Sequence, residues 1–308
     1  MSFEIPILLI VFNRPEKTQI IFDIIKKIKP NKLFISADGP RKNRSKDIDL
    51  CNQTKLIIKQ IDWDCDYSFQ FQEKNVGCKV NVINSIDWFF LNNEMGIILE
   101  DDCVPSKSFF SFCEELLNKY RDNEEIMQIN GFNCGLNFNS YIQDSYYFSK
   151  LNHTWGWASW KRAWNKFDRN LFKYTEYKDE NKIHTYYVDK QISNWMERYL
   201  DKAFNDEDNI WSSNWSFSIL KENGLCITPA VNLVRNIGFD KTSTSGKAKI
   251  FEKFSKAQEL EMDKLLHPKY IKFNLELDKL TFNQVIKKID PRASKFYYLI
   301  NLLRNFLR

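Results

Sequence analysis

Short apolar runs and helix-like repeats alternate along the first 130 residues, and this alternation constrains the fold more than any other feature. Residues 6–12 (PILLIVF) and 33–37 are largely apolar, as is typical of strands buried on both faces. Between them, isoleucines recur at helical spacing from Ile20 to Ile28. Helices are expected around 56–61, 83–90 and 108–120, and strands around 67–71, 96–99 and 126–129. The pattern predicts an α/β domain with a Rossmann-like, mostly parallel sheet flanked by helices.

Polar residues follow three of the predicted strands directly. They are Asn13-Arg14 after the first strand, Asp38-Gly39 after the second, and Glu100-Asp101-Asp102 after the run GIIL. In open α/β sheets, ligands bind outside the carboxyl ends of the strands. The three groups therefore predict a ligand site at one edge of the sheet.

The acidic triplet Glu100-Asp101-Asp102 indicates a cation site. Adjacent carboxylates repel one another, which raises their pKa values unless a cation neutralises them. Mg²⁺ and Mn²⁺ prefer such oxygen ligands and often share coordination with a substrate's phosphates. A metal held there can stabilise a departing diphosphate. The alternative is a helix cap or a solvated turn, but the position after a buried strand favours a functional site.

Composition excludes several classes of protein. The 308 residues are 43% hydrophobic and 15% aromatic, which excludes a disordered or low-complexity chain. No stretch approaches about 18 uncharged apolar residues, so no membrane span is expected. Residues 1–12 lack the pattern of a secretory signal, and the seven cysteines form no CxxC pair. We therefore expect reduced thiols and a cytoplasmic protein.

Positive charge is concentrated at the C-terminus. Residues 279–308 hold seven Lys/Arg against one Asp and so carry a net charge of +6. The whole chain carries +5, so the other residues together are nearly neutral. A nucleic-acid-binding protein would usually spread that charge over a groove, so no nucleic-acid partner is expected. The apolar residues of 294–308 share one helical face, which predicts a basic helix on the cytoplasmic face of an anionic membrane. The alternative is a helix docked on the protein itself or in a dimer.

Five segments resemble a family of bacterial glycosyltransferase-like proteins with the GT-A nucleotide-diphospho-sugar fold. They are PILLIVFNRPEKT, LFISADGPR, NVGCKVNVINSIDWFF, GIILEDDCVPSKSFFSFCEELLNKY and TWGWASWKRAW. More distantly they are similar to the N-acetylglucosaminyltransferase I family, which carries the same Glu-Asp-Asp triplet. The resemblance implies a GT-A domain over 1–240, with a nucleotide half to about 130 and an acceptor half beyond it. Beyond the segments that carry the resemblance, the sequence predicts for residues 241–308 a Lys/Ser/Gly-rich loop over 241–249 that serves as a lid, and C-terminal helices, including one over 250–266.

The resemblance also implies the chemistry. A divalent metal (Mn²⁺ or Mg²⁺) would assist transfer of a sugar from a nucleotide-diphosphate donor, expected to be UDP-linked. The acceptor would be a hydroxyl of a cell-surface glycan or lipid-linked oligosaccharide, with inversion as the default. The first rival is a sugar-phosphate nucleotidyltransferase, which normally needs a glycine-rich, Arg-containing loop after the first strand, whereas FNRPEKT has no glycine. The second is a nucleotide-sugar-binding module without activity.

Individual roles follow from the same resemblance. The residues that it places around the nucleotide are Phe12, Asn13, Arg14, Asp38, Gly39, Asn75, Gly77, Lys79 and Asp101. Within that set, Arg14 and Asp38 would contact the base and Asp101 the ribose. Glu100 would face the donor sugar as a catalytic residue, and Asp102 would hold the metal.

One position departs from the family pattern. The family carries the catalytic base, an Asp, directly after the first Trp of the segment that begins NIWSSNW, whereas this chain has Ser212. Serine does not take up a proton at neutral pH. We expect Asp208 to supply the carboxylate, with Asp206 and Glu207 as neighbouring alternatives. The other possibilities are a reaction that relies on metal and positioning, or loss of activity with nucleotide binding retained.

Tryptophans are dense between 155 and 215, and several are candidates for the acceptor site. The residues expected to line an acceptor cleft are Trp155, Gly156, Trp157, Trp211 and Asn214. Tryptophan rings can stack on sugar faces, and a glycine between two tryptophans permits close approach of a ligand or another backbone. The alternative is core packing, which tryptophan does more often.

Overall fold

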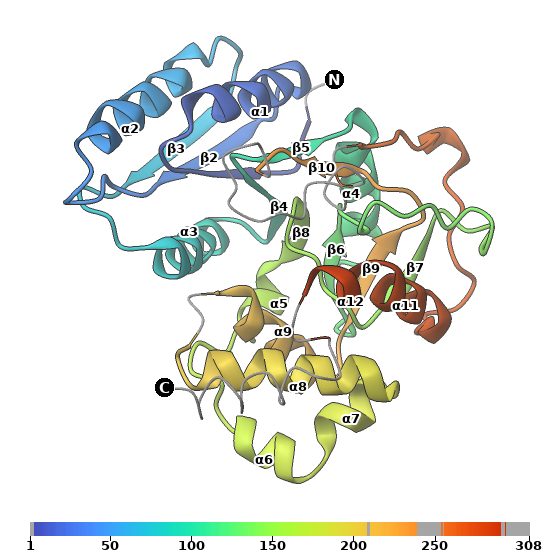
Figure 1. The fold of residues 1–308 in the computed structure, drawn as a ribbon. Coiled ribbons are helices and arrows are strands. Elements are labelled where there is room, and N and C mark those ends of the chain that lie inside the picture. The colour runs from blue at the N-terminus through green and yellow to red at the C-terminus, as the bar shows by residue number, and fades with distance from the viewer. Residues whose placement is uncertain (1–2, 208–209, 239–253, 255, 291–292, 294–308) are drawn as a thin grey trace.

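An eight-stranded sheet forms the centre of the molecule in the computed structural model, which describes residues 3–207, 210–238, 254, 256–290 and 293 (Figure 1). The strand order is β3-β2-β1-β4-β8-β6-β9-β7. The strands are β1 (Ile7–Val11), β2 (Lys32–Ala37), β3 (Asp66–Phe71), β4 (Met95–Glu100), β6 (Ile126–Asn130), β7 (Tyr146–Ser149), β8 (Trp157–Trp160) and β9 (Leu225–Pro229). Only β7 and β8 run against the others. The predicted α/β class with a mostly parallel sheet is confirmed.

Helices cover both faces of the sheet. The longer ones are α1 (Pro15–Ile28), α2 (Ser45–Ile57), α3 (Cys78–Asn92), α4 (Lys107–Lys119), α8 (Lys190–Phe204) and α9 (Ser212–Lys221). The strands alternate between the faces: Ile7 and Leu9 pack in the core that contains α1 and α4, whereas Leu8 and Ile10 pack against α3 and α9. Figure 1 shows α1 and α2 above the parallel strands and α3 below them.

Smaller elements complete the architecture. Strand β5 (Cys103–Pro105) directly follows the acidic triplet and pairs antiparallel with β10 (Val234–Asn236). The short helices are α5 (Lys161–Trp164), α6 (Tyr174–Asp179), α7 (Lys182–Tyr187), α11 (Leu275–Thr281) and α12 (Lys287–Ile289). Helices α6, α7 and α8 form a separate helical layer at the bottom of Figure 1, with its own apolar cluster.

The prediction of a helix over 250–266 is wrong for the described part of that range. Residues 256–261 have no regular structure, and one 3₁₀ turn spans Met262–Lys264. The Glu259 carboxylate accepts hydrogen bonds from the backbone N–H groups of Lys107 and Ser108, at 2.9 and 2.7 Å, and so caps α4. Leu260 and Leu265 pack on the core from this extended segment. Tertiary contacts therefore override the helical spacing.

The C-terminal region is attached to the sheet through α11 and the residues after it. Phe282, Val285 and Ile286 are buried in apolar clusters of the protein. The predicted membrane helix over 294–308 and the predicted lid over 241–249 lie outside the described residues. Within the described residues, no helix combines the length and apolar character needed to cross a bilayer. Both the boundary at residue 240 and membrane attachment stay predictions.

Replacing Asp278 with asparagine is expected to remove a pH dependence of stability. Its carboxylate, 1% exposed on α11, accepts from Ser149 Oγ at 2.6 Å and Lys150 N at 2.9 Å, and burial raises its pKa to about 7. Between about pH 4 and pH 7 the native carboxyl keeps a proton that the unfolded chain has lost, so wild-type stability falls as pH rises. At about pH 8, Asp278→Asn should be more stable by about 2 kcal/mol.

Urea unfolding at about pH 5 and pH 8 measures this difference. Asp263→Asn, which changes an exposed carboxylate, should keep the wild-type pH dependence. An Asp278→Asn curve that runs parallel to wild type across this range would show that the Asp278 carboxyl does not bind the proton.

Candidate functional site

A cavity of about 310 Å³ lies where the carboxyl ends of β1, β2 and β4 meet, and we call it the strand-end cavity. Six of the residues predicted from the sequence line it: Phe12, Arg14, Asp38, Asn75, Glu100 and Asp101. They come from three strand ends and the loop before α3, so the structure brings together groups that are up to 89 residues apart in the chain. The predicted convergence at one sheet edge is confirmed in geometry, whereas the individual roles stay predictions.

Arg14 forms an ion pair with two carboxylates of the acidic triplet. It stands directly after β1, and Pro15 begins α1 immediately behind it. Its Nη1 lies 3.1 Å from Asp101 Oδ1 and 2.8 Å from Asp102 Oδ2. The Phe12 backbone N–H also donates to Asp101 Oδ2, at 3.3 Å. The cation that the triplet requires is therefore supplied, at least in part, by the chain itself.

Glu100 and Asp101 have strongly altered proton affinities. Burial, reinforced by the charges of Asp102 and Asp101, raises the pKa of Glu100 to about 8. Burial also raises the pKa of Asp101 to about 6, although the Arg14 guanidinium opposes the shift. Within the described residues, no hydrogen bond to the Glu100 side chain is present. A half-buried carboxyl without such a partner beside a cavity is typical of a group that meets a ligand.

Asp38 holds the loop before α3 in place. Its Oδ1 accepts from the backbone N–H groups of Gly39 (2.8 Å) and Val76 (2.9 Å), and its Oδ2 from Asn75 Nδ2 (2.8 Å) and the Gly77 N–H (3.2 Å). A Cβ on Gly39 would lie 2.5 Å from the Lys74 backbone, so the loop packs directly on this glycine. Both carboxylate oxygens are thus engaged by the protein. A contact with a nucleobase would have to be made in addition to these four bonds.

The other residues predicted for the nucleotide lie around the cavity rather than in its lining. Asn13 Nδ2 donates to Asp47 Oδ1 at 2.9 Å and is tied to α2. Gly77, with φ of 88°, precedes α3, and Lys79 lies half-buried in the first turn of that helix. Gly39 lies under the loop. Asn13, Gly39 and Gly77 thus contact neighbouring parts of the protein itself.

Arg41 is a cavity residue that the sequence reasoning missed. Its guanidinium lies 5.3 Å from the centre of the Phe12 ring, and its Nε and Nη2 donate to Asp47 at 2.5 and 2.9 Å. The hydrogen bond from Arg41 holds the pKa of Asp47 well below its usual range. Its position three residues after Asp38, within LFISADGPR, was the available signal. Cys78 and Asn81, from the start of α3, line the same cavity.

The donor set around Asp102 fits a divalent ion only together with a substrate. Asp102 Oδ2 is paired with Arg14, and its Oδ1 accepts from Asn236 Nδ2 at 3.3 Å. In the part of the chain that the structure describes, no group of three His, Cys, Asp or Glu side chains could hold a metal. Mg²⁺ commonly uses one or two carboxylates and takes its remaining ligands from phosphates and water. Asp102 fits such a shared site, provided that Arg14 shifts.

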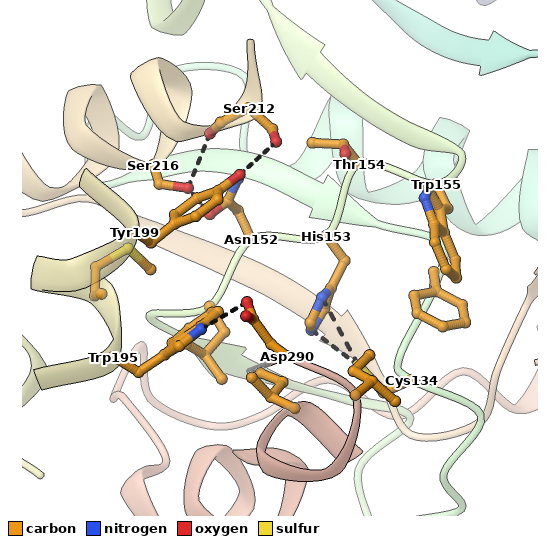
Figure 2. Close-up of a pocket in the computed structure, with 15 residues that line it drawn as sticks. Cys134, Asn152, His153, Thr154, Trp155, Trp195, Tyr199, Ser212, Ser216 and Asp290 are labelled. Carbon is orange, nitrogen blue, oxygen red and sulfur yellow. Dashed lines mark hydrogen bonds between the residues drawn. The ribbon is translucent and has the colours of Figure 1, made fainter. Parts of the chain in front are cut away.

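A second cavity, of about 260 Å³, lies between the segment before β8 and helices α8, α9 and α12; we call it the aromatic cavity (Figure 2). Trp155, predicted for the acceptor cleft, lines it, and so does Ser212, the residue at the expected base position. The Ser212 Oγ lies 2.9 Å from the hydroxyl of Tyr199, which projects from α8. Figure 2 also shows Asp290 accepting a hydrogen bond, of 3.0 Å, from Trp195 Nε1.

Three of the residues predicted for the acceptor cleft belong to the core instead. Trp157 and Trp211 are 1% and 5% exposed, and their rings stack 5.8 Å apart. Asn214 is 1% exposed and donates to the backbone oxygens of Asp168 and Arg169. Packing between β8 and α9 buries these three side chains, so a ligand cannot reach them in this conformation. Trp155 alone of the three tryptophans predicted for this cleft has surface on the cavity.

Gly156 permits close packing of the protein on itself. It has a φ of 62°, and a Cβ there would lie 2.8 Å from Val234 Cγ2. Its carbonyl accepts from the Gly131 N–H at 2.8 Å. A glycine at this position was expected to permit close approach of either a ligand or another backbone segment. The structure shows the approach of another segment of the protein.

The predicted bases are not brought to the aromatic cavity by the described structure. Asp208 lies outside the described residues, and Asp206 and Glu207 lie exposed just after α8. The sequence reasoning missed His153, Tyr199 and Asp290, which line the cavity. Burial lowers the pKa of His153 to about 4, so its ring is neutral at neutral pH. No local pattern marks these three residues, because they come from distant segments.

Comparisons with known proteins give only distant similarity. No family model and no curated protein matches the chain. Among solved structures, HddC from Yersinia pseudotuberculosis is 8% identical and matches 50% of this chain and 77% of its own, with a TM-score of 0.29. 4-Diphosphocytidyl-2C-methyl-D-erythritol synthase from Anaerococcus prevotii is 10% identical and matches 56% of this chain and 82% of its own, with a TM-score of 0.30. Values this low do not support an assignment of family or activity.

Proposed function

We propose that the protein is a transferase that binds a nucleotide-diphosphate-linked sugar in the strand-end cavity. The observation that carries the proposal is the meeting of Arg14 with Asp101 and Asp102 at the carboxyl ends of β1 and β4. A guanidinium can pair with phosphate oxygens as it pairs with carboxylates, so Arg14 can exchange its partners when a diphosphate enters. The half-buried Glu100 lies beside that position.

The finer proposal is glycosyl transfer. The bond from the sugar's anomeric carbon to the diphosphate oxygen breaks, and a bond to an acceptor hydroxyl oxygen forms, with inversion as the default. Asp102 would hold a divalent ion, which would supply positive charge to the diphosphate leaving group. UDP is the proposed nucleotide, and a surface glycan or lipid-linked oligosaccharide the proposed acceptor. The aromatic cavity, with Trp155 and Tyr199 in its lining, would receive the acceptor.

The acceptor's proton needs a base other than Ser212. The Ser212 hydroxyl is hydrogen-bonded to Tyr199, and neither group is basic at neutral pH. Asp290 contributes a carboxylate to the aromatic cavity, held by Trp195. We therefore add Asp290 to Asp208 as a candidate base.

A sugar-phosphate nucleotidyltransferase is the second candidate function. The observation in its favour is an arginine, Arg14, directly behind the first strand and facing the site. Against it, only residues 12–14 separate β1 from α1, and they include no glycine. So short a connection offers few backbone N–H groups to a triphosphate. We therefore rank glycosyl transfer first.

A thermal-shift screen followed by product analysis tests both candidates. With Mn²⁺ present, UDP-sugars at about 100 times their Kd should stabilise the protein by about 2.7 kcal/mol. Arg14→Ala should abolish the shift, whereas Arg44→Ala, an exposed arginine in the same half of the chain, should keep it. Release of UDP from a UDP-sugar supports glycosyl transfer. Release of pyrophosphate from a nucleoside triphosphate and a sugar phosphate supports the second candidate. No shift with any nucleotide contradicts both.

A further inference from the structure

Strand β3 forms one edge of the sheet, and no described strand lies along its outer side. Within the described residues it pairs only with β2. The N–H groups of Asp66 and Gln72 donate to Asn31 and Ala37, so the even-numbered residues of β3 direct their backbone groups toward β2. Because direction alternates along a strand, the N–H and C=O groups of Tyr67, Phe69 and Phe71 point to the open edge.

The same three residues expose an aromatic row. Tyr67, Phe69 and Phe71 are 51%, 43% and 37% exposed. Their rings are stacked, with centroids 5.2 and 5.4 Å apart. Natural edge strands usually carry a lysine, a proline or a bulge that prevents pairing with another chain, and the sequence DYSFQF contains neither lysine nor proline. This edge is therefore competent to pair.

We propose that β3 pairs antiparallel with β3 of a second copy of this chain, about a two-fold axis through Phe69. In this register Phe69 faces Phe69, and Tyr67 faces Phe71 of the partner. These are the residues whose outward backbone groups are open, and they form hydrogen-bonded pairs. A shift by one residue would direct those groups away from the partner and separate the aromatic rows.

Side-chain chemistry supports this register. The facing pairs of Tyr67, Phe69 and Phe71 are all aromatic, and aromatic pairs in facing positions stabilise neighbouring strands. Beyond them, Asp66 of one copy faces Gln72 of the other, so no like charges face each other along the strand. The edge is thus self-complementary in backbone groups and rings, which favours a second copy over an unrelated partner.

The dimer would also border the strand-end cavity. Lys74 directly precedes the Asn75–Gly77 loop that Asp38 holds, and its backbone packs on Gly39. The proposal itself does not depend on the proposed function, because it rests on β3 alone.

Sedimentation velocity on the full-length protein, from about 5 to 200 µM, tests the interface. Wild type should approach the mass of two 36.9 kDa chains as concentration rises. Phe69→Lys, which places two cations at the axis, should remain a monomer and keep the melting temperature that wild type has at the lowest concentration. Phe172→Lys, at a ring 68% exposed elsewhere, should dimerise as wild type. A wild-type monomer at every concentration, or a dimer that survives Phe69→Lys, would overturn the proposal.

Cross-linking tests the register. Phe69→Cys should form an intermolecular disulfide under mild oxidation, since facing residues of a hydrogen-bonded pair lie about 5.5 Å apart. Leu91→Cys, on exposed α3, is the control for random cross-linking. A yield of cross-linked Phe69→Cys no higher than that of Leu91→Cys would exclude this register.

Discussion

Asp102→Asn should lower the turnover of the nucleotide-sugar donor by about 100-fold or more. The Asp102 side chain is 17% exposed and contacts Asn236 and also Arg14, which lines the strand-end cavity. Asparagine preserves the shape and the bond to Asn236 but removes the charge that would hold a cation with the diphosphate. Initial rates with the donor identified by the thermal-shift screen measure the loss.

Stability separates this loss from misfolding. The pair with Arg14 is partly exposed, and Arg14 retains Asp101, so the melting temperature of Asp102→Asn should stay close to wild type. Asp122→Asn, an exposed carboxylate after α4, should have wild-type rates. Equal rates for wild type and Asp102→Asn would assign the triplet a structural role and contradict the proposed transferase.

Asp38→Ala should destabilise the protein by about 3 kcal/mol. The Asp38 side chain is buried, and its removal leaves four N–H donors of residues 39 and 75–77 without their acceptor. The loop that forms one wall of the strand-end cavity would lose its anchor, so nucleotide affinity should fall as well. Urea unfolding at constant m-value measures the stability loss, and calorimetry with UDP and Mn²⁺ measures the affinity.

The result discriminates between two roles of this residue. If Asp38 acts only on a nucleobase, as the family resemblance implies, the ligand-free variant should unfold at the wild-type midpoint and lose affinity alone. Asp49→Ala, an exposed aspartate on α2, is the matched control and should change neither property.

Local periodicity was sufficient to predict the main helices and strands of the first half of the fold. Of the isoleucines at helical spacing, Ile21 and Ile25 are buried on α1, whereas Ile20 is 42% exposed. The apolar runs became β1, β2 and β4. Periodicity is a local property, and burial on a regular element follows from it directly. The same reasoning was wrong for residues 256–266, because Glu259 and Leu260 bond to the start of α4 and hold that segment extended.

Residue type alone did not separate a binding surface from a core. Trp155 and Trp157 are two positions apart, yet the first lines the aromatic cavity and the second is buried against Trp211. Trp155 precedes β8, Gly156 with a φ of 62° redirects the chain between the two, and Trp157 packs with residues of α9. None of this is visible in the composition. Asp290 and Tyr199 reach the same cavity from segments about 90 residues apart, which no local pattern joins.

The sequence by itself determined the alternation of strands and helices over about the first 130 residues and placed Arg14, Asp38 and Glu100-Asp101-Asp102 at strand ends. Parallel strands end on the same side, so these groups had to share an edge. Only the tertiary structure decided which of them touch: Arg14 bridges Asp101 and Asp102, whereas Asp38 bonds to the loop before α3. Side-chain contacts depend on distances between segments remote in the chain, and those distances exist only once the sheet and its helices are packed.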